Sequence, residues 1–196
     1  MKLLCVAGFL GSGKTTLLLD LARRMTAASL RLAIVENEIG EIGVDGGFLR
    51  EAGLPVRELF GGCICCTLQT GLVATLRAIA AEYDPDWVIV EPTGLAAPGD
   101  ITTSVRALLP HIDHIRVVTL VDAERWEMLS QVVEPLITAQ IAAADVIAVN
   151  KVDTVDGEVL AAVTAAVRRS NAAAPIIPVA AATGAGVQAL YEALLA

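Results

Sequence analysis

A glycine-rich segment near the start of the chain restricts the possible folds more than any other feature of the sequence. Residues 8–15 read GFLGSGKT; they follow an apolar run at 3–7 and precede a helical pattern at 15–28. This run satisfies the P-loop pattern, and its flanks are the strand and the helix that a P-loop requires. We therefore expect an α/β protein of the P-loop NTPase class.

The rest of the chain alternates short apolar runs with helical patterns. The apolar runs predict strands at 3–7, 32–35, 56–59, 87–90, 117–121, 146–149 and 176–179. The helical patterns between them lie at 15–28, 68–81, 123–129, 135–144, 158–169 and 187–194. Near-continuous apolar strands separated by helices predict a mostly parallel, seven-stranded sheet with helices on both faces. Ligands are then expected at the carboxyl ends of the strands.

Composition and charge exclude several classes of protein. Apolar residues make up 55% of the chain and charged residues 18%, which excludes disorder. The sequence lacks an apolar run of about eighteen residues and the regions of a signal peptide, so we expect no membrane partner and a cytoplasmic location. A net charge of −8 without a basic stripe argues against a nucleic-acid partner. The length of 196 residues predicts a single domain over 1–196.

The glycine-rich segment carries the residues of a phosphate site. Its glycines let backbone N–H groups turn inward around an anion, and the following helix N-terminus adds a positive dipole. In this arrangement Lys14 reaches the β- and γ-phosphates, and the Thr15 hydroxyl ligates Mg²⁺. The nucleotide-binding residues predicted here are Gly11, Ser12, Gly13, Lys14, Thr15 and Thr16.

An acidic residue after the strand at 87–90 completes the expected magnesium site. Residues 91–94 read EPTG, which places a carboxylate and a glycine beside the phosphates. Glu91 is expected to hold Mg²⁺ through water, and the Gly94 N–H to sense the γ-phosphate. Lys14, Thr15 and Glu91 are therefore the predicted catalytic residues, and Thr15 and Glu91 the predicted magnesium ligands. A solvated strand end is the alternative interpretation of Glu91.

The motif NKVD at 150–153 predicts which base the site selects. The carboxylate of Asp153 can accept hydrogen bonds from N1 and N2 of guanine, which adenine cannot supply. Lys151 is expected to lay its stem along the purine, and Asn150 to tie this loop to the P-loop. After the last strand, the backbone N–H of Ala181 can reach guanine O6. These residues predict GTP and GDP, rather than ATP, as ligands.

Three of the four cysteines lie within four residues, as Cys63, Cys65 and Cys66. They follow two glycines and precede a predicted helix, whose N-terminus favours thiolates. Three thiolates suit Zn²⁺ best and Co²⁺ next, with Glu36, Glu41 or a client protein as the source of a fourth ligand. The predicted metal ligands are therefore Cys63, Cys65, Cys66 and Glu36. Packing alone and redox or iron–sulfur chemistry are the alternatives.

The remaining cysteine and the two histidines are expected to play no part in metal binding. Cys5 lies within the first apolar run and is predicted to be a core residue. His111 and His114 follow a proline in a predicted loop, so we interpret both as surface residues.

Taken in order, five segments resemble the CobW-type family of metal-chaperone GTPases, which is related to the nickel-insertion GTPases of urease and hydrogenase maturation. They read GFLGSGKTT, ENEIGEIGVD, GGCICCTL, EPTG and NKVD. The resemblance covers residues 1–196 and implies that the three clustered cysteines bind metal and that residues 36–45 form a nucleotide-responsive switch. It also implies that GTP and Mg²⁺ order the metal site and that hydrolysis releases the metal to a client. A homodimer assembled on GTP is a further expectation by analogy.

The chain departs from this family pattern at its C-terminus. Most members carry a second, C-terminal domain, which we expect to be absent here, and Ala180 replaces a common serine. The leading hypothesis is a slow, regulated GTPase that delivers a transition metal or metal cofactor to a client metalloenzyme or corrinoid protein. The alternative is a nucleotide-dependent docking module that gates such a partner without carrying metal. A small-molecule kinase is disfavoured, because such enzymes select ATP.

Overall fold

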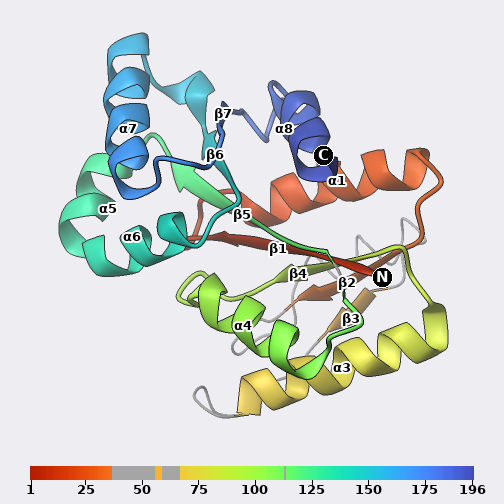
Figure 1. Ribbon diagram of the computed structural model, residues 1–196. Helices are drawn as coiled ribbons and strands as arrows, with labels where there is room; N and C mark the ends of the chain where they lie inside the picture. The colour runs from red at the N-terminus through yellow and green to blue at the C-terminus, as the bar shows by residue number, and fades with distance from the viewer. Residues whose placement is uncertain (37–55, 59–66, 113) are drawn as a thin grey trace.

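The computed structural model describes residues 1–36, 56–58, 67–112 and 114–196, without the side chains of residues 36, 56–58 and 67–70. Their strands form one seven-stranded sheet in the order β3-β2-β4-β1-β5-β6-β7 (Figure 1). The strands are β1 (Lys2–Gly8), β2 (Leu32–Glu36), β3 (Val56–Glu58), β4 (Trp87–Glu91), β5 (Ile115–Asp122), β6 (Val146–Asn150) and β7 (Ile176–Pro178). All the pairings between these strands are parallel. The parallel α/β sheet expected from the sequence is confirmed.

Helices cover both faces of this sheet. They are α1 (Lys14–Ala27), α3 (Thr67–Tyr83), α4 (Pro98–Leu108), α5 (Trp126–Val132), α6 (Glu134–Ala142), α7 (Gly157–Ser170) and α8 (Val187–Leu195), with a 3-10 turn η1 (Val152–Thr154). Figure 1 shows α1 beside α8 over one face, and α3, α4, α6 and α7 over the other. Among the described helices, none has the length and apolar character needed to cross a membrane.

The central strand β1 shows why its sequence is apolar without interruption. Leu4 and Val6 pack against α1 and α8, whereas Leu3, Cys5 and Ala7 point to the opposite face. These side chains are at most 1% exposed, because helices cover the sheet on both sides. Burying a Leu or Val side chain in this way stabilises the fold by about 1.5–3 kcal/mol. Cys5 is 0% exposed, which confirms it as a core residue, and this burial raises the pKa of its thiol to about 12.

Helix α4 occupies a stretch to which the sequence analysis assigned no helix. Its interior holds Ile101, Thr102 and Val105, β-branched residues that have a modest helix propensity. Pro98 stands at the start of the helix, where its fixed φ is favourable and its missing N–H costs nothing. Burial of Val105 and of Leu109 just beyond the helix against the sheet therefore outweighs the weak local preference.

Candidate nucleotide-binding site

The glycine-rich segment makes a tight turn from the end of β1 into α1. Gly8, Gly11 and Gly13 have φ values of 141°, 72° and 96°, which side chains rarely adopt. A Cβ on Gly8 would lie 2.6 Å from the Leu120 carbonyl oxygen, and one on Gly13 would collide with the Asn150 amide nitrogen. The segment therefore needs glycine at these positions, and it ends at the N-terminus of α1, where an anion is favoured.

Lys14 and Ser12 give this turn a polar interior. Lys14 is only 7% exposed, and its Nζ lies 3.4 Å from the Phe9 carbonyl oxygen across the turn. Burial lowers the pKa of Lys14, while the nearby charge of Glu91 acts in the opposite direction. The Ser12 Oγ is buried and makes no hydrogen bond to any part of the chain that the structure describes. A buried cation and a buried hydroxyl at a helix N-terminus fit an anionic ligand with several acceptor oxygens.

Thr15 and Glu91 meet at the mouth of the turn, as the sequence analysis predicted. The Thr15 hydroxyl donates to Glu91 Oε1 at 3.1 Å. The contact arises because β4 pairs with β1 in parallel, so both strands end at the same edge of the sheet. A hydroxyl and a carboxylate are hard oxygen donors, so these two residues fit Mg²⁺. The second predicted nucleotide contact on α1, Thr16, lies exposed on its first turn.

The loop after β4, which follows Glu91 and is called the acidic loop below, is fixed by Gln140, a residue that the sequence analysis did not identify. Gln140 is 2% exposed, and its Nε2 donates to the carbonyl oxygens of Gly94 at 3.1 Å and Ala96 at 3.0 Å. The same loop lies against the P-loop, because a Cβ on Gly94 would stand 2.6 Å from the Leu10 backbone nitrogen. A single glutamine within the apolar helix α6 was the available sequence signal.

Replacing Gly94 with alanine tests how closely these two loops pack. We expect Gly94→Ala to destabilise the protein by about 1–3 kcal/mol, because the new methyl group forces Leu10 and the P-loop to shift. Thermal unfolding measures the effect. Gly157→Ala is the matched control, since its Cβ meets nothing within 4 Å. Equal melting temperatures for the two variants would contradict this packing.

Asn150 joins three loops at the other end of the site. It is 2% exposed; its Nδ2 donates to the Ser12 carbonyl oxygen at 2.7 Å, and its Oδ1 accepts from the Ala181 N–H at 2.9 Å. The structure thus brings Asn150 to the P-loop, as predicted. The Ala181 N–H donates to Asn150 because this buried side-chain oxygen requires a donor, and its contact with guanine O6 stays a prediction.

Lys151 and Asp153, the two other residues of the NKVD motif with predicted base contacts, differ in their surroundings. Asp153 lies exposed on η1, where its carboxylate is accessible to a ligand. Lys151 has a left-handed backbone, with φ of 64°. Its Nζ lies 2.9 Å from Asp122 Oδ2 and 3.5 Å from the exposed carboxylate of Glu124.

Asp122 is a second site residue that the sequence analysis did not identify. It ends β5 with a fully buried side chain, whose Oδ2 also accepts from Arg125 Nε at 2.7 Å. Burial alone raises the pKa of Asp122, but hydrogen bonds from Lys151 and Arg125 outweigh this effect and hold the pKa below its ordinary value. The Arg125 guanidinium continues to the P-loop, where Nη2 donates to the Leu10 carbonyl oxygen at 2.7 Å. An aspartate that closes an apolar strand was the only sequence signal.

The predicted transition-metal ligands cannot be placed in the same way. Cys63, Cys65 and Cys66 lie outside the described residues, and so does the side chain of Glu36. The backbone of Glu36 ends β2 in register with Glu91. Within the described ranges, histidine, cysteine and acidic side chains form no metal-binding group of three or more. The metal site thus stays a prediction from the sequence.

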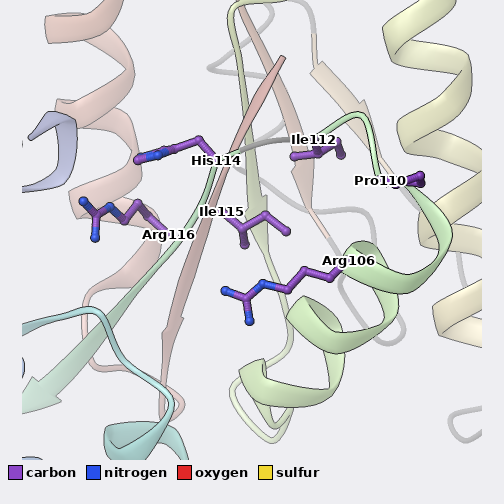
Figure 2. A pocket seen from close by; sticks show the side chains of 6 residues that line it. All are labelled: Arg106, Pro110, Ile112, His114, Ile115 and Arg116. Atoms are coloured by element: carbon purple, nitrogen blue, oxygen red, sulfur yellow. The ribbon is translucent and has the colours of Figure 1, made fainter.

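A depression at the opposite edge of the sheet lies away from these residues. It lies where α4 ends and β5 begins, and its lining is Arg106, Pro110, Ile112, His114, Ile115 and Arg116 (Figure 2). His111 is exposed as predicted, but His114 is partly buried and packs edge-on against Trp87, with ring centroids 5.5 Å apart. His114 thus borders a depression in the surface with part of its ring covered, and burial lowers the pKa of this imidazole.

Comparison with known proteins gives relatives named as zinc chaperones, and they match most of this chain. The zinc chaperone YeiR of Escherichia coli is 34% identical over 150 residues, which cover 76% of this chain and 45% of YeiR. The zinc chaperone CobW of Pseudomonas aeruginosa is 32% identical over 193 residues, which cover 82% of this chain and 51% of that protein. The chain thus spans about half the length of these curated relatives.

Solved structures agree with this relationship at the level of the fold. The hydrogenase maturation factor HypB of Archaeoglobus fulgidus superposes with a TM-score of 0.73 at 20% identity, covering 98% of this chain and 87% of HypB. The Zn(II)-bound YjiA GTPase of E. coli gives a TM-score of 0.63 at 24% identity, covering 90% of this chain and 56% of YjiA. The family described as CobW/HypB/UreG, nucleotide-binding domain, matches residues 2–178. With its P-loop, acidic loop and NKVD loop at one edge of a parallel sheet, this chain belongs to the CobW/HypB/UreG family.

Proposed function

We propose that this protein binds Mg·GTP, hydrolyses it slowly and under regulation, and thereby delivers a transition metal or metal cofactor to a client metalloenzyme or corrinoid protein. The observation that carries the nucleotide part is the convergence of Lys14, the Thr15–Glu91 pair and Asn150 at one edge of the sheet. The metal part is supported by the clustered cysteines and by relatives named as zinc chaperones. Zn²⁺ is the first candidate and Co²⁺ the second.

Hydrolysis of GTP requires little covalent chemistry from the protein. Water attacks the γ-phosphorus while the bond to the β–γ bridging oxygen breaks, and the products are GDP and phosphate. In this proposal Lys14 neutralises charge on the β- and γ-oxygens, and the glycine turn donates backbone N–H groups to them. Thr15 and Glu91 would hold Mg²⁺, which supplies further charge neutralisation when it is bound.

The proposed choice of guanine rests on Asp153 and on the hydrogen bonds of Asn150, which begins the same motif. The Asp153 carboxylate offers two acceptor oxygens to the N1–H and N2–H donors of guanine. Asn150 ties this loop to the P-loop through its hydrogen bond to the Ser12 carbonyl oxygen, and to the loop after β7 through its bond from the Ala181 N–H. This contact supports recognition of the base and the phosphates by loops that are joined to each other.

The link between nucleotide and metal follows from the order of the strands. Glu36 and Glu91 end the neighbouring parallel strands β2 and β4, and their Cα atoms are in register. The proposed magnesium carboxylate and the proposed fourth metal ligand therefore come from adjacent positions on one edge. This proximity supports a cycle in which the γ-phosphate and Mg²⁺ order the metal site and hydrolysis releases the metal.

A nucleotide-dependent docking module is the alternative, and exposed apolar side chains favour a partner at this edge. Leu10 in the P-loop is 52% exposed, and Leu95 in the neighbouring acidic loop is 57% exposed. Apolar side chains beside a nucleotide site are suited to a contact that forms in one nucleotide state, either with a client or with a second copy of this chain. If docking alone is the function, GTP must change partner affinity equally in the wild type and in a variant without the three clustered cysteines.

The rate of hydrolysis tests the regulated GTPase. We expect the purified protein to hydrolyse GTP at well below about 1 s⁻¹ without a partner. A regulated switch has to remain in its GTP-bound state until a partner acts on it. Phosphate release under saturating Mg·GTP measures this rate. A turnover of about 100 s⁻¹ or more, or a preference for ATP, would contradict the proposal.

Replacing one clustered cysteine tests the metal cargo. We expect Cys65→Ala or Cys66→Ala to abolish tight uptake of Zn²⁺ and Co²⁺, because two thiolates and a carboxylate bind these metals much less tightly than three thiolates do. Metal analysis after gel filtration gives the stoichiometry. Cys5 provides no substitute ligand, since burial raises the pKa of its thiol to about 12. Unchanged stoichiometry in either variant would refute the cysteine site.

A further inference from the structure

The side chain of Asp122 receives two cations that come from different parts of the site. Its Oδ2 lies 2.9 Å from Nζ of Lys151 in the NKVD loop and 2.7 Å from Nε of Arg125 at the start of α5. Its Oδ1 accepts from the Arg125 backbone N–H at 3.2 Å. Because the carboxylate is fully buried, these hydrogen bonds replace those that water would make to an exposed carboxylate.

Arg125 extends this arrangement to the phosphate loop. Its Nη2 donates to the Leu10 carbonyl oxygen at 2.7 Å, and the same guanidinium lies against Gly11, where a Cβ would approach Nη2 to 3.0 Å. The backbone nitrogen of Leu10 faces the acidic loop at Gly94. Leu10 thus lies between Arg125, which is bound to Asp122, and the loop that follows the proposed magnesium ligand Glu91.

We propose that Asp122 is a positioning residue that couples guanine recognition to the shape of the P-loop. Asp122 binds Lys151 and Arg125 with one carboxylate, so a shift of either side chain affects the other. Lys151 is proposed to lie along the base, and Arg125 holds Leu10 of the P-loop. This inference rests on the proposed function, since it takes a guanine nucleotide as the ligand. Charge supports it: Asp122 is buried between two cations, whereas the other carboxylate near Lys151, Glu124, is exposed at 3.5 Å.

A double-mutant cycle measured by calorimetric titration with GDP tests the coupling. Lys151→Gln and Arg125→Gln each remove one cation from Asp122 and are expected to weaken GDP binding. In the wild-type background their combined effect should differ from the product of the single effects by about 3-fold or more, the size typical of groups in one network. In an Asp122→Asn background the difference should disappear. Glu124→Gln, which removes a carboxylate from the same lysine, should change affinity by less than about 2-fold.

The outcomes separate this inference from the proposed function. GDP binding by the wild type with independent single effects, or with coupling that persists in Asp122→Asn, would overturn the role of Asp122 and leave the GTPase proposal intact. Failure of the wild type to bind GDP or GTP would refute both. Circular dichroism establishes that each variant is folded. If Asp122→Asn does not fold, the cycle in the wild-type background decides: coupling supports the inference and additivity overturns it.

Discussion

Lys14→Ala is expected to reduce GTP hydrolysis by about 100-fold or more, because it removes the one buried cation of the P-loop from the charge that develops on the phosphates. The same substitution should abolish the rise in melting temperature that GDP confers on the wild type. The nucleotide-free protein should lose little stability, since burial lowers the pKa of Lys14 and so disfavours its charged form in the fold. Loss of ligand effects without loss of the fold distinguishes a binding lysine from a structural one.

Single-turnover hydrolysis and thermal unfolding with and without GDP measure these effects. Lys2→Ala is the control, because Lys2 is an exposed lysine whose Nζ lies 5.2 Å from the Trp87 ring centroid, at the opposite end of β1. The control should keep both the rate and the GDP-induced stabilisation. Hydrolysis by Lys14→Ala within a few-fold of the wild type would show that the phosphates bind elsewhere.

Asp153→Asn is expected to weaken GTP binding by about 100-fold or more, since the N2 amino group of guanine then meets an amide instead of a carboxylate acceptor. The same variant should gain affinity for xanthosine triphosphate. Xanthine carries an oxygen where guanine carries N2, and an asparagine side chain can accept from N1–H while it donates to that oxygen. A reversal of preference is a stronger result than a loss, because misfolding cannot produce it.

Competition between the two nucleotides for a fluorescent GDP analogue measures this preference. Glu158→Gln removes a neighbouring exposed carboxylate at the start of α7 and should leave the preference unchanged. If Asp153→Asn binds GTP as tightly as the wild type does, the NKVD loop does not read the base.

Much of the fold and part of the site could be predicted from sequence because their signals are local. Most strands are short apolar runs, although β3 reads Val-Arg-Glu, and the P-loop and NKVD motifs hold their chemistry within a few consecutive residues. The meeting of Thr15 and Glu91 could also be predicted, since parallel strands that follow one another in a sheet end at the same edge. Their roles toward a nucleotide stay predictions.

The residues that sequence analysis did not identify act over long separations in the chain. Arg125 reaches Leu10, which is 115 residues away, and Gln140 reaches Gly94, which is 46 residues away. Nothing near either residue indicates its partner, because the contacts depend on how α5 and α6 pack at the sheet edge. Helix α4 was not predicted for a related reason. Burial against the sheet stabilises it more than the helix propensity of its residues does. The contact of His114 with Trp87 could not be predicted either, because it forms only in the folded chain.

Titration of the protein with Zn²⁺ and Co²⁺, first with Mg·GDP and then with a non-hydrolysable GTP analogue, tests whether the nucleotide controls metal binding. Charge-transfer absorption from thiolate to Co²⁺ reports the cysteine site, and competition with Zn²⁺ gives the affinity. We expect one stoichiometric site that binds metal more tightly with the GTP analogue than with GDP. Equal affinities in the two nucleotide states would contradict a nucleotide-gated metallochaperone.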